Sequence, residues 1–460
     1  MSDTAHCDDP LIVSVSGLRG IVGRSLTPAV AVRYVAAFEA TLPPGPVVIG
    51  RDGRQSGPEF AAAIAGFLTA AGRDVIDCGV AATPTVGVAI RDRGAAGGIQ
   101  ISASHNPARY NGFKLFSREG RVIPAAAGRE VLARYEASPA EVAPHDRATR
   151  GNRTAFDAAP AHVALVAATV DVAAIRRHRP RVWLDAGHGA GSLAARLLFD
   201  HLGCEAVIEG GTPDGLFEHE PEPTPEHLAA WLPRIPAAGA AVGFFQDPDA
   251  DRLAIATATG RYVGEEATLA LAVEGVLAKT RGPIVVNCST SGMSAAIAAR
   301  HGAPCHVSQV GEANVVDEML ARGAVLGGEG NGGVIDPRVV LVRDSLVAMA
   351  IVLGRMCAGP ALVPLESLCA DLPKLVMKKT KLAVSAGLRG PALLVAFDRV
   401  AAAFPDSRVD RLDGLRVDWS AGWLLVRASN TEPIVRIVAE AGDEAAVDAA
   451  IARAAAAISA

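Results

Sequence analysis

Aromatic residues are scarce in this chain: Phe, Trp and Tyr make up 4% of its 460 positions. Aromatic rings are the platforms on which single-stranded nucleic acids stack, so their scarcity argues against such a ligand. The formal net charge of −5 also argues against electrostatic capture of a polyanion. We therefore expect no nucleic-acid partner, and a phosphorylated ligand would need a local group of arginines to hold it.

The chain also lacks paired cysteines and long apolar runs. Its seven cysteines are scattered, odd in number and never spaced Cys-x-x-Cys, which argues against a disulfide framework or a zinc site. No uncharged apolar run reaches the roughly 18 residues of a membrane span, since Glu274 interrupts the best candidate, Ala267 to Ala278. Met1 to Pro10 carries acids and no apolar core, unlike a secretory signal. We expect a cytoplasmic protein with reduced thiols and no membrane partner.

Half of the residues are apolar, and short apolar runs recur in three similar units of three runs each. These runs are rich in β-branched residues and end in polar loops, which is typical of buried strands. The nine predicted strands are Val47–Asp52, Asp74–Asp77, Gly98–Ser102, Val182–Asp185, Ala206–Glu209, Ala241–Phe245, Ile284–Asn287, Cys305–Val307 and Ala324–Gly327. Helix-like stretches lie between them at Gly57–Ala71, Gly191–Leu202 and Ser291–His301.

Alternation of strands and helices predicts parallel sheets that are flanked by helices. From Lys374 onward the pattern changes: a hairpin of Arg416–Trp419 and Trp423–Arg427 precedes a helix from about Glu444 to Ile458. The fold prediction is three related α/β domains with mixed, largely parallel sheets, followed by a C-terminal α+β domain. The predicted domain bounds are 1–145, 154–257, 258–370 and 371–460.

The third strand of each unit runs into a loop of distinctive composition. The loop of the second unit has the pattern Asp-x-Asp-x-Asp-Arg, in which alternate carboxylates form an oxygen cage suited to Mg²⁺. An acidic loop without a ligand is the alternative, but this loop follows the buried run Val242–Phe245, where unpaired acids would be costly. We predict that Mg²⁺ is bound by Asp247, Asp249 and Asp251. Arg252 is expected to pair with a carboxylate or with a substrate phosphate.

The loop of the first unit places the Ser104 hydroxyl before turn-forming residues, and Lys114 returns toward it. A serine beside a metal ion suggests phosphoryl transfer, because the ion neutralises charge that develops on the migrating group. A plain turn is the alternative. A hydrolytic Ser-His-Asp triad fits poorly, because no nucleophile elbow accompanies the serine. We expect His105 to orient the loop.

Two further loops carry groups that suit a sugar phosphate. The stretch Arg427–Pro433, with Arg436, concentrates two guanidiniums, two hydroxyls and an amide, and arginine forks match phosphate oxygens. Glycines around Glu329 and Asn331 permit close backbone approach, and the two side chains suit vicinal sugar hydroxyls. A capped turn with surface arginines and a glycine-rich turn are the respective alternatives. Arg19, in Ser-Gly-Leu-Arg-Gly, is a weaker signal.

Together these five loops resemble the α-D-phosphohexomutase superfamily, in the order of that family and over nearly the whole chain. The combination of Ser-His-Asn-Pro with Asp-x-Asp-x-Asp-Arg is highly specific. The resemblance implies four domains around a central cleft, each with one signature loop. It also implies that Ser104 is the phosphoserine and a ligand of the magnesium ion beside the three aspartates.

The same resemblance assigns the remaining residues. Catalytic assistance at the phosphoserine would come from Arg19, Lys114, His105 and Arg252. The sugar would be bound by Glu329, Asn331 and Glu312, and the non-transferring phosphate by Arg427, Ser429, Asn430, Thr431 and Arg436. One departure is that many relatives end the sugar loop with Ser-Gly-His, whereas this chain has Asn-Gly-Gly at 331–333. A histidine proposed as acid/base is therefore absent, and the loop is similar to the archaeal-type variant.

The resemblance implies interconversion of hexose 6-phosphate and hexose 1-phosphate through a bisphosphorylated sugar, with hexose 1,6-bisphosphate as activator. Glucosamine 6-phosphate is the favoured substrate, because Glu312 lies where relatives vary with substrate and would attract a protonated 2-amino group. The alternatives are a broad phosphomannomutase/phosphoglucomutase, a magnesium-dependent phosphomonoesterase and a non-catalytic sensor. The expected partner is a small sugar phosphate, and a homodimer is left open.

Overall fold

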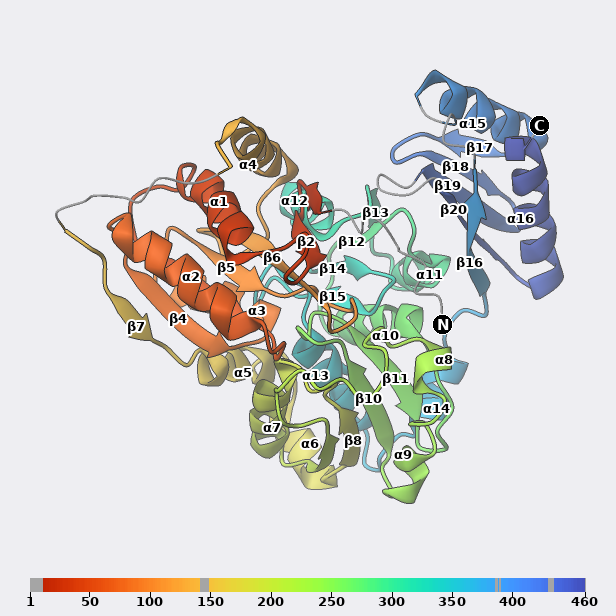
Figure 1. The fold of residues 1–460 in the computed structure, drawn as a ribbon. Coiled ribbons are helices and arrows are strands. Elements are labelled where there is room, and N and C mark those ends of the chain that lie inside the picture. The colour runs from red at the N-terminus through yellow and green to blue at the C-terminus, as the bar shows by residue number, and fades with distance from the viewer. Residues whose placement is uncertain (1–10, 141–148, 385–387, 389, 429–433, 460) are drawn as a thin grey trace, which may run out of the picture.

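The computed structural model describes residues 11–140, 149–384, 388, 390–428 and 434–459 (Figure 1). The first unit is a seven-stranded sheet with the order β1-β2-β6-β5-β3-β4-β7. Its strands are β1 (Ile12–Ser14), β2 (Gly17–Ile21), β3 (Val47–Arg51), β4 (Val75–Val80), β5 (Gly97–Ile101), β6 (Tyr110–Ser117) and β7 (Arg153–Ala155). Its helices are α1 (Pro28–Glu39), α2 (Gly57–Ala70), α3 (Thr83–Asp92) and α4 (Ala125–Ala137).

The second and third units each contain a four-stranded sheet, with the orders β11-β10-β8-β9 and β13-β12-β14-β15. The strands are β8 (Arg181–Asp185), β9 (Glu205–Glu209), β10 (Val242–Gln246), β11 (Leu253–Thr257), β12 (Ile284–Asn287), β13 (Cys305–Ser308), β14 (Leu326–Glu329) and β15 (Gly333–Ile335). The helices are α5 (Ala159–Ala167), α6 (Val172–His178), α7 (Gly191–Leu202), α8 (Pro225–Leu228), α9 (Arg234–Ala237), α10 (Glu265–Leu277), α11 (Gly292–Arg300), α12 (Glu312–Arg322), α13 (Ser345–Met356) and α14 (Leu365–Ala370).

The three units repeat one arrangement, and the predicted α/β fold class is confirmed. In each unit the first predicted strand is central and parallel to the second and third. A return strand then pairs antiparallel with the third strand, as β6, β11 and β15 do. Only antiparallel neighbours can be joined by a short turn, so each signature loop lies at the turn of such a hairpin.

The fourth unit is an antiparallel sheet with the order β16-β20-β19-β18-β17. Its elements are β16 (Val376–Ala383), α15 (Pro391–Ala403), β17 (Arg408–Asp410), β18 (Leu415–Trp419), β19 (Gly422–Ala428), β20 (Ile434–Ala441) and α16 (Glu444–Ser459). The predicted hairpin and closing helix are both confirmed. Figure 1 shows this unit at the upper right, with α15 and α16 against its sheet.

Apolar packing joins the first three units and leaves the fourth with a core of its own. One buried cluster includes Val48 of the first sheet, Val182 of the second and Ile284 of the third. A separate cluster, around Leu424 and Val447, lies between the fourth sheet and its helices. The predicted domain bounds remain a prediction; strand β7, beyond residues 141–148, pairs with β4 in the first sheet.

Two smaller expectations concern thiols and membrane segments. The six described cysteines are free, and Cys7 lies outside the described residues. Within the described part of the chain, no single helix is both long and apolar enough to cross a membrane, although the bent pair α5 and α6 meets that test jointly.

Candidate active site

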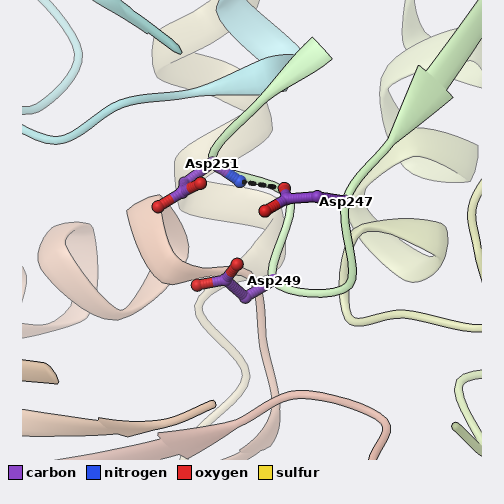
Figure 2. Close-up of side chains that lie close together, drawn as sticks. All are labelled: Asp247, Asp249 and Asp251. Atoms are coloured by element: carbon purple, nitrogen blue, oxygen red, sulfur yellow. Dashed lines mark hydrogen bonds between the residues drawn. The ribbon is translucent and has the colours of Figure 1, made fainter. Parts of the chain in front are cut away.

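The turn between β10 and β11 carries Asp247, Asp249 and Asp251, all fully buried. The Asp247 Oδ1 atom accepts a hydrogen bond from the backbone N–H of Asp251 at 3.1 Å (Figure 2) and another from that of Arg252, also at 3.1 Å, and the two bonds close the turn. Ala250 adopts a left-handed backbone with φ of 57°. One carboxylate oxygen from each aspartate lies within 4.8 Å of the others. The loop therefore forms the predicted carboxylate cluster.

The cluster retains oxygen atoms that suit a metal ion. Lys114 of β6 donates from Nζ to Asp249 Oδ2 at 2.6 Å and to Asp251 Oδ2 at 2.5 Å. The Oδ1 atoms of these two aspartates are buried and accept no hydrogen bond in the described structure. Buried polar atoms normally have partners, and Mg²⁺ prefers oxygen donors, carboxylates among them. These residues therefore fit a magnesium ion.

Neighbouring charges give Asp247 and Asp251 different proton affinities. Burial, with the charges of Asp251 and Asp249, raises the pKa of Asp247 well above its usual range. Burial would also raise the pKa of Asp251, but Arg343 and Lys114 lower it instead. Burial opposes the charge on Lys114, but the carboxylates of Asp249 and Asp251 raise its pKa. Lys114 and Arg343 are thus the cations that stabilise the negative charge of the cluster.

Ser104 lies in the turn between β5 and β6 and faces the aspartates. Its Oγ atom donates to Asp247 Oδ2 at 2.7 Å, across 143 positions of sequence. The residue is buried, and its φ of 49° lies in the left-handed region that few side chains adopt. The structure thus brings the predicted nucleophile and the predicted metal ligands together.

His105 contacts the serine, and two arginines lie close enough to His105 to affect its charge. His105 Nδ1 lies 3.4 Å from Ser104 Oγ, and its Nε2 lies 4.0 Å from Glu222 Oε1. Burial, reinforced by the charges of Arg252 and Arg19, lowers the pKa of His105 to about 2, so the ring is neutral at neutral pH. Burial and Arg252 also lower the pKa of Arg19. Arg19 and Arg252 repel each other and both act on His105, the neighbour of the serine, so an anionic ligand is favoured there.

The sugar loop is tied to the metal loop by Arg343, which the sequence patterns did not single out. Its Nη1 donates to Glu329 Oε2 and its Nη2 to Asp251 Oδ2, both at 2.6 Å. Its backbone N–H donates to Glu312 Oε1 at 2.8 Å. Glu329 Oε1 additionally accepts from Asn287 Nδ2 at 2.8 Å. Glu329 and Glu312 are therefore already part of an ion-pair network, whereas Asn331 Oδ1 accepts a hydrogen bond from the Gly333 backbone N–H at 3.2 Å.

The predicted phosphate residues lie farther along the same face. A cavity of about 710 Å³ is lined by His105, Glu222, Ser289, Val310, Lys379, Thr380, Lys381, Leu425, Arg427, Arg436 and Val438. These residues come from all four units. Ser429, Asn430 and Thr431 were also predicted to bind phosphate, and they lie outside the described residues.

Strand pairing places three of the cations in a row across the fourth sheet. Arg436 of β20 lies opposite Arg427 of β19 on one side and opposite Lys381 of β16 on the other. Arg427 Nε donates to Asp413 Oδ1 at 2.9 Å. Like charges directly opposite one another destabilise a sheet unless an anion compensates them. Sequence reasoning missed Lys381, because its neighbours became known only from the register.

A nucleophilic hydroxyl that touches a carboxylate cage, at one end of a cation-lined cavity, is chemistry suited to phosphoryl transfer. Models of the phosphoglucomutase/phosphomannomutase α/β/α domains I, II and III match residues 11–141, 160–260 and 265–376. The model of the C-terminal domain matches 381–457. The chain belongs to this family, within the α-D-phosphohexomutase superfamily, and is an enzyme that transfers phosphate intramolecularly.

Relatives and solved structures agree with this assignment. A phosphoglucomutase/phosphomannomutase of Thermococcus kodakarensis is 35% identical over 435 residues, which cover 93% of this chain and 94% of that protein. A probable phosphoglucosamine mutase of Methanopyrus kandleri is 32% identical and covers 93% of both chains. The crystal structure of a phosphoglucomutase/phosphomannomutase family protein from Burkholderia thailandensis has a TM-score of 0.82 at 28% identity, covering 97% of this chain and 98% of that one.

Proposed function

We propose that this phosphohexomutase converts glucosamine 6-phosphate to glucosamine 1-phosphate, with relaxed activity on glucose and mannose phosphates. The reaction proceeds through a phosphoserine at Ser104 and a bisphosphorylated sugar. The observation that carries the phosphoserine assignment is the 2.7 Å contact between Ser104 Oγ and Asp247 Oδ2. This contact supports the assignment, because it brings the Ser104 hydroxyl oxygen to the carboxylate cluster.

The proposed ligands of a magnesium ion are the phosphoserine and the three aspartates of the cluster. When bound, the ion would neutralise charge that develops on the migrating phosphoryl group. The unpartnered Oδ1 atoms of Asp249 and Asp251 support this assignment, because Lys114 occupies only their Oδ2 atoms. Lys114 and Arg19 then hold the transferring phosphate from the side of the first unit.

The exchange needs two phosphate positions. A sugar hydroxyl oxygen attacks the phosphorus on Ser104, the bond to Oγ breaks, and the sugar then carries two phosphates. The intermediate turns over in the cavity, and Ser104 Oγ attacks the other phosphorus. The bond from that phosphorus to the sugar oxygen breaks, and this oxygen takes up a proton to balance the one lost by the attacking hydroxyl in the first step. Arg427 and Arg436, with Lys381 beside them, hold whichever phosphate is not transferring. A row of cations suits this task, because it recognises phosphate without regard to which sugar carbon bears it.

The substrate choice rests on the names of several archaeal relatives and on the position of Glu312. Arg343 already contacts Glu312 through its backbone N–H and lies 3.5 Å from the carboxylate through Nε. A substrate amino group would therefore share this carboxylate with Arg343. A Glu312→Gln variant should lower kcat/KM for glucosamine 6-phosphate more than for glucose 6-phosphate, and an equal loss for both sugars would remove Glu312 from the discrimination.

A second candidate is a broad phosphomannomutase/phosphoglucomutase, which the 35% identical relative favours by its name. The deciding experiment compares kcat/KM for glucosamine, glucose and mannose phosphates, each with a hexose 1,6-bisphosphate activator present. We expect glucosamine phosphate to lead. A preference of about tenfold or more for mannose or glucose phosphate, equal to about 1.4 kcal/mol in transition-state binding, would overturn the substrate while leaving the mechanism standing.

A further inference from the structure

Arg54 is a buried arginine whose every N–H donor is used on the backbone or side chains of the first unit. It follows strand β3, where Asp52 accepts hydrogen bonds from the Arg54 backbone N–H and from its Nε, both at 3.0 Å. The side chain is 1% exposed. A guanidinium has five N–H donors, and one of them is thus committed to a buried carboxylate.

The other four donors go to backbone carbonyls of the turn that carries Ser104. Nη2 donates to the carbonyl oxygens of Ser104 at 2.6 Å and Asn106 at 2.5 Å. Nη1 donates to those of Pro107 at 2.7 Å and Tyr110 at 2.9 Å. With all five donors engaged, Arg54 has none left for a substrate. It can act on the reaction only through the turn.

Ser102 contacts Asp52 and Ser104 on the amide side of the serine, and we call the group of Arg54, Asp52 and Ser102 the frame. Its Oγ donates to Asp52 Oδ2 at 2.7 Å and accepts from the backbone N–H of Ser104 at 2.8 Å. Asp52 therefore fixes the amide of Ser104 through Ser102 and its carbonyl through Arg54. The left-handed φ of 49° at Ser104 is a conformation that persists only where surroundings over-determine it.

The frame is also in contact with the unit that carries the metal loop. The ring centroid of Phe217 lies 5.0 Å from the guanidinium carbon of Arg54. Phe217 precedes Glu222 and the strands that hold the carboxylate cluster. The position of the serine turn is therefore set relative to the second unit as well as within the first.

We propose that Arg54, with Asp52 and Ser102, positions the Ser104 hydroxyl for phosphoryl transfer by holding its turn in the left-handed conformation. This inference rests on the proposed phosphoserine role of Ser104. Arg54 is a positioning residue, because its contacts are with the turn and not with reacting atoms. Loss of the frame should lower the rate of transfer and leave sugar-phosphate binding, which uses the fourth unit, largely unchanged.

The first test compares Arg54→Gln with a matched control, Arg73→Gln. Arg73 also donates to one carboxylate, that of Glu39, and to several carbonyls of the first unit, but none of these lies in the serine turn. Misplacement of a reacting group by about 1 Å can cost about 100-fold in rate. We expect Arg54→Gln to lower kcat by about that factor with KM changed by less than about twofold, and Arg73→Gln to lose a comparable Tm without a loss of kcat.

Ser102 supplies a second, smaller test in case Arg54→Gln does not fold. Ser102→Ala should lower kcat by about tenfold, and Ser102→Thr, which keeps the hydroxyl, should restore most of it. Single-turnover phosphorylation by glucose 1,6-bisphosphate, followed by intact mass, should be slower in Ser102→Ala but reach the wild-type extent. Hydrogen exchange of the 102–110 peptide, measured without added metal, should be faster.

Two outcomes separate this inference from the function on which it rests. If the wild-type enzyme turns over and both Arg54→Gln and Ser102→Ala keep its kcat and phosphorylation rate, the positioning role is wrong. If Arg54→Gln does not fold, wild-type rates in Ser102→Ala alone overturn the role. If the wild-type protein neither turns over hexose phosphates nor accepts a phosphoryl group on Ser104, the proposed function fails first.

Discussion

Ser104 and Asp247 lie 143 positions apart in the chain, yet their side chains touch. The serine supplies the atom through which every phosphoryl group must pass, while binding relies on other residues. We predict that Ser104→Ala abolishes mutase turnover and leaves sugar-phosphate binding measurable by calorimetry. The purified wild-type protein should carry one labile phosphoryl group on part of its molecules by intact mass. Near-wild-type turnover in Ser104→Ala would sink the phosphoserine assignment.

Asp249 separates a binding effect from an effect on the chemical step. Its substitution by Asn removes one ligand charge from the cluster, and the bound ion acts mainly on charge that develops in the transition state. We expect Asp249→Asn to lower kcat much more than it raises KM and to weaken the dependence of activity on Mg²⁺. Asp448→Asn, on the exposed face of α16, is the charge-matched control. Unchanged kcat together with EDTA-resistant activity would contradict the metal assignment.

Arg427 belongs to the cation row and not to the transferring site. Loss of a charge-assisted contact to phosphate costs on the order of 2–3 kcal/mol, so Arg427→Ala should raise KM by roughly 30- to 150-fold. Arg408→Ala serves as control, since Arg408 is an exposed arginine on β17 of the same sheet. A normal KM in Arg427→Ala would place the phosphate site elsewhere.

The sequence singles out candidate site residues that occur in compact motifs. It does not single out residues whose partners become known only from tertiary contacts. The serine, the three aspartates and Arg427 stand in short patterns with a chemical meaning of their own. Arg54 and Arg343 are single arginines, and each gains its role from partners about 50 or 90 positions away. A charged residue next to an apolar run was the only available signal, and in most proteins such a residue is a solvated strand end.

At the scale of elements, each signature loop lies at the turn of a β-hairpin. Nine strands could be predicted, because buried parallel strands are continuous apolar runs. The return strands β11 and β15 were not predicted, because Leu253–Thr257 and Gly333–Ile335 are short segments that follow directly on the signature loops. Tertiary pairing decides such short segments.

A glycine in the loop of the third unit lies against the hairpin of the second unit, so its substitution measures how closely the two hairpins pack. Gly332 has φ of 80°, and an added Cβ would lie 2.2 Å from the backbone oxygen of Leu253 in the second unit. Gly302 has a similar φ of 65° but open space around its Cβ position. Gly302→Ala should cost about 1–2 kcal/mol of unfolding free energy from backbone strain alone. We expect Gly332→Ala to cost distinctly more in urea unfolding and to reduce kcat/KM, and equal costs would contradict close packing of the two hairpins.

At the scale of the molecule, one apolar core spans three units and the fourth stands apart. Contacts between the third and fourth units are largely polar, such as Arg416 Nη1 to the Cys288 carbonyl at 2.6 Å and Glu440 to the Gly292 N–H at 2.7 Å. A small apolar cluster around Trp423 adds to them. Interfaces of this kind permit relative motion, whereas a shared core does not.

We therefore predict that the fourth unit opens before the rest. In native-state hydrogen exchange with mild denaturant, amides of β18–β20 and α16 should exchange at a lower free energy than those of β10 and β12. Bound sugar phosphate should slow amide exchange most in the fourth unit, because the cation row belongs to the sheet of that unit. Exchange of all four units in a single step would show one cooperative body instead.

The recurrent hairpin also bears on how such an enzyme could arise and change. Pairing of Gln246 with Leu253, and of Glu329 with Gly333, clamps both ends of a turn to its sheet. Substitutions within a turn that keep these two pairs leave the strand register unchanged, and the contacts of Gly332 with Leu253 and of Arg343 with Asp251 limit which substitutions a turn accepts. Duplication of one ancestral α/β segment would supply three equivalent hairpin turns. One turn could then specialise in carrying the nucleophile, one in binding the metal ion and one in binding the sugar. Replacing a turn by one from another protein, with the flanking strand pairs kept, is a route to new specificity.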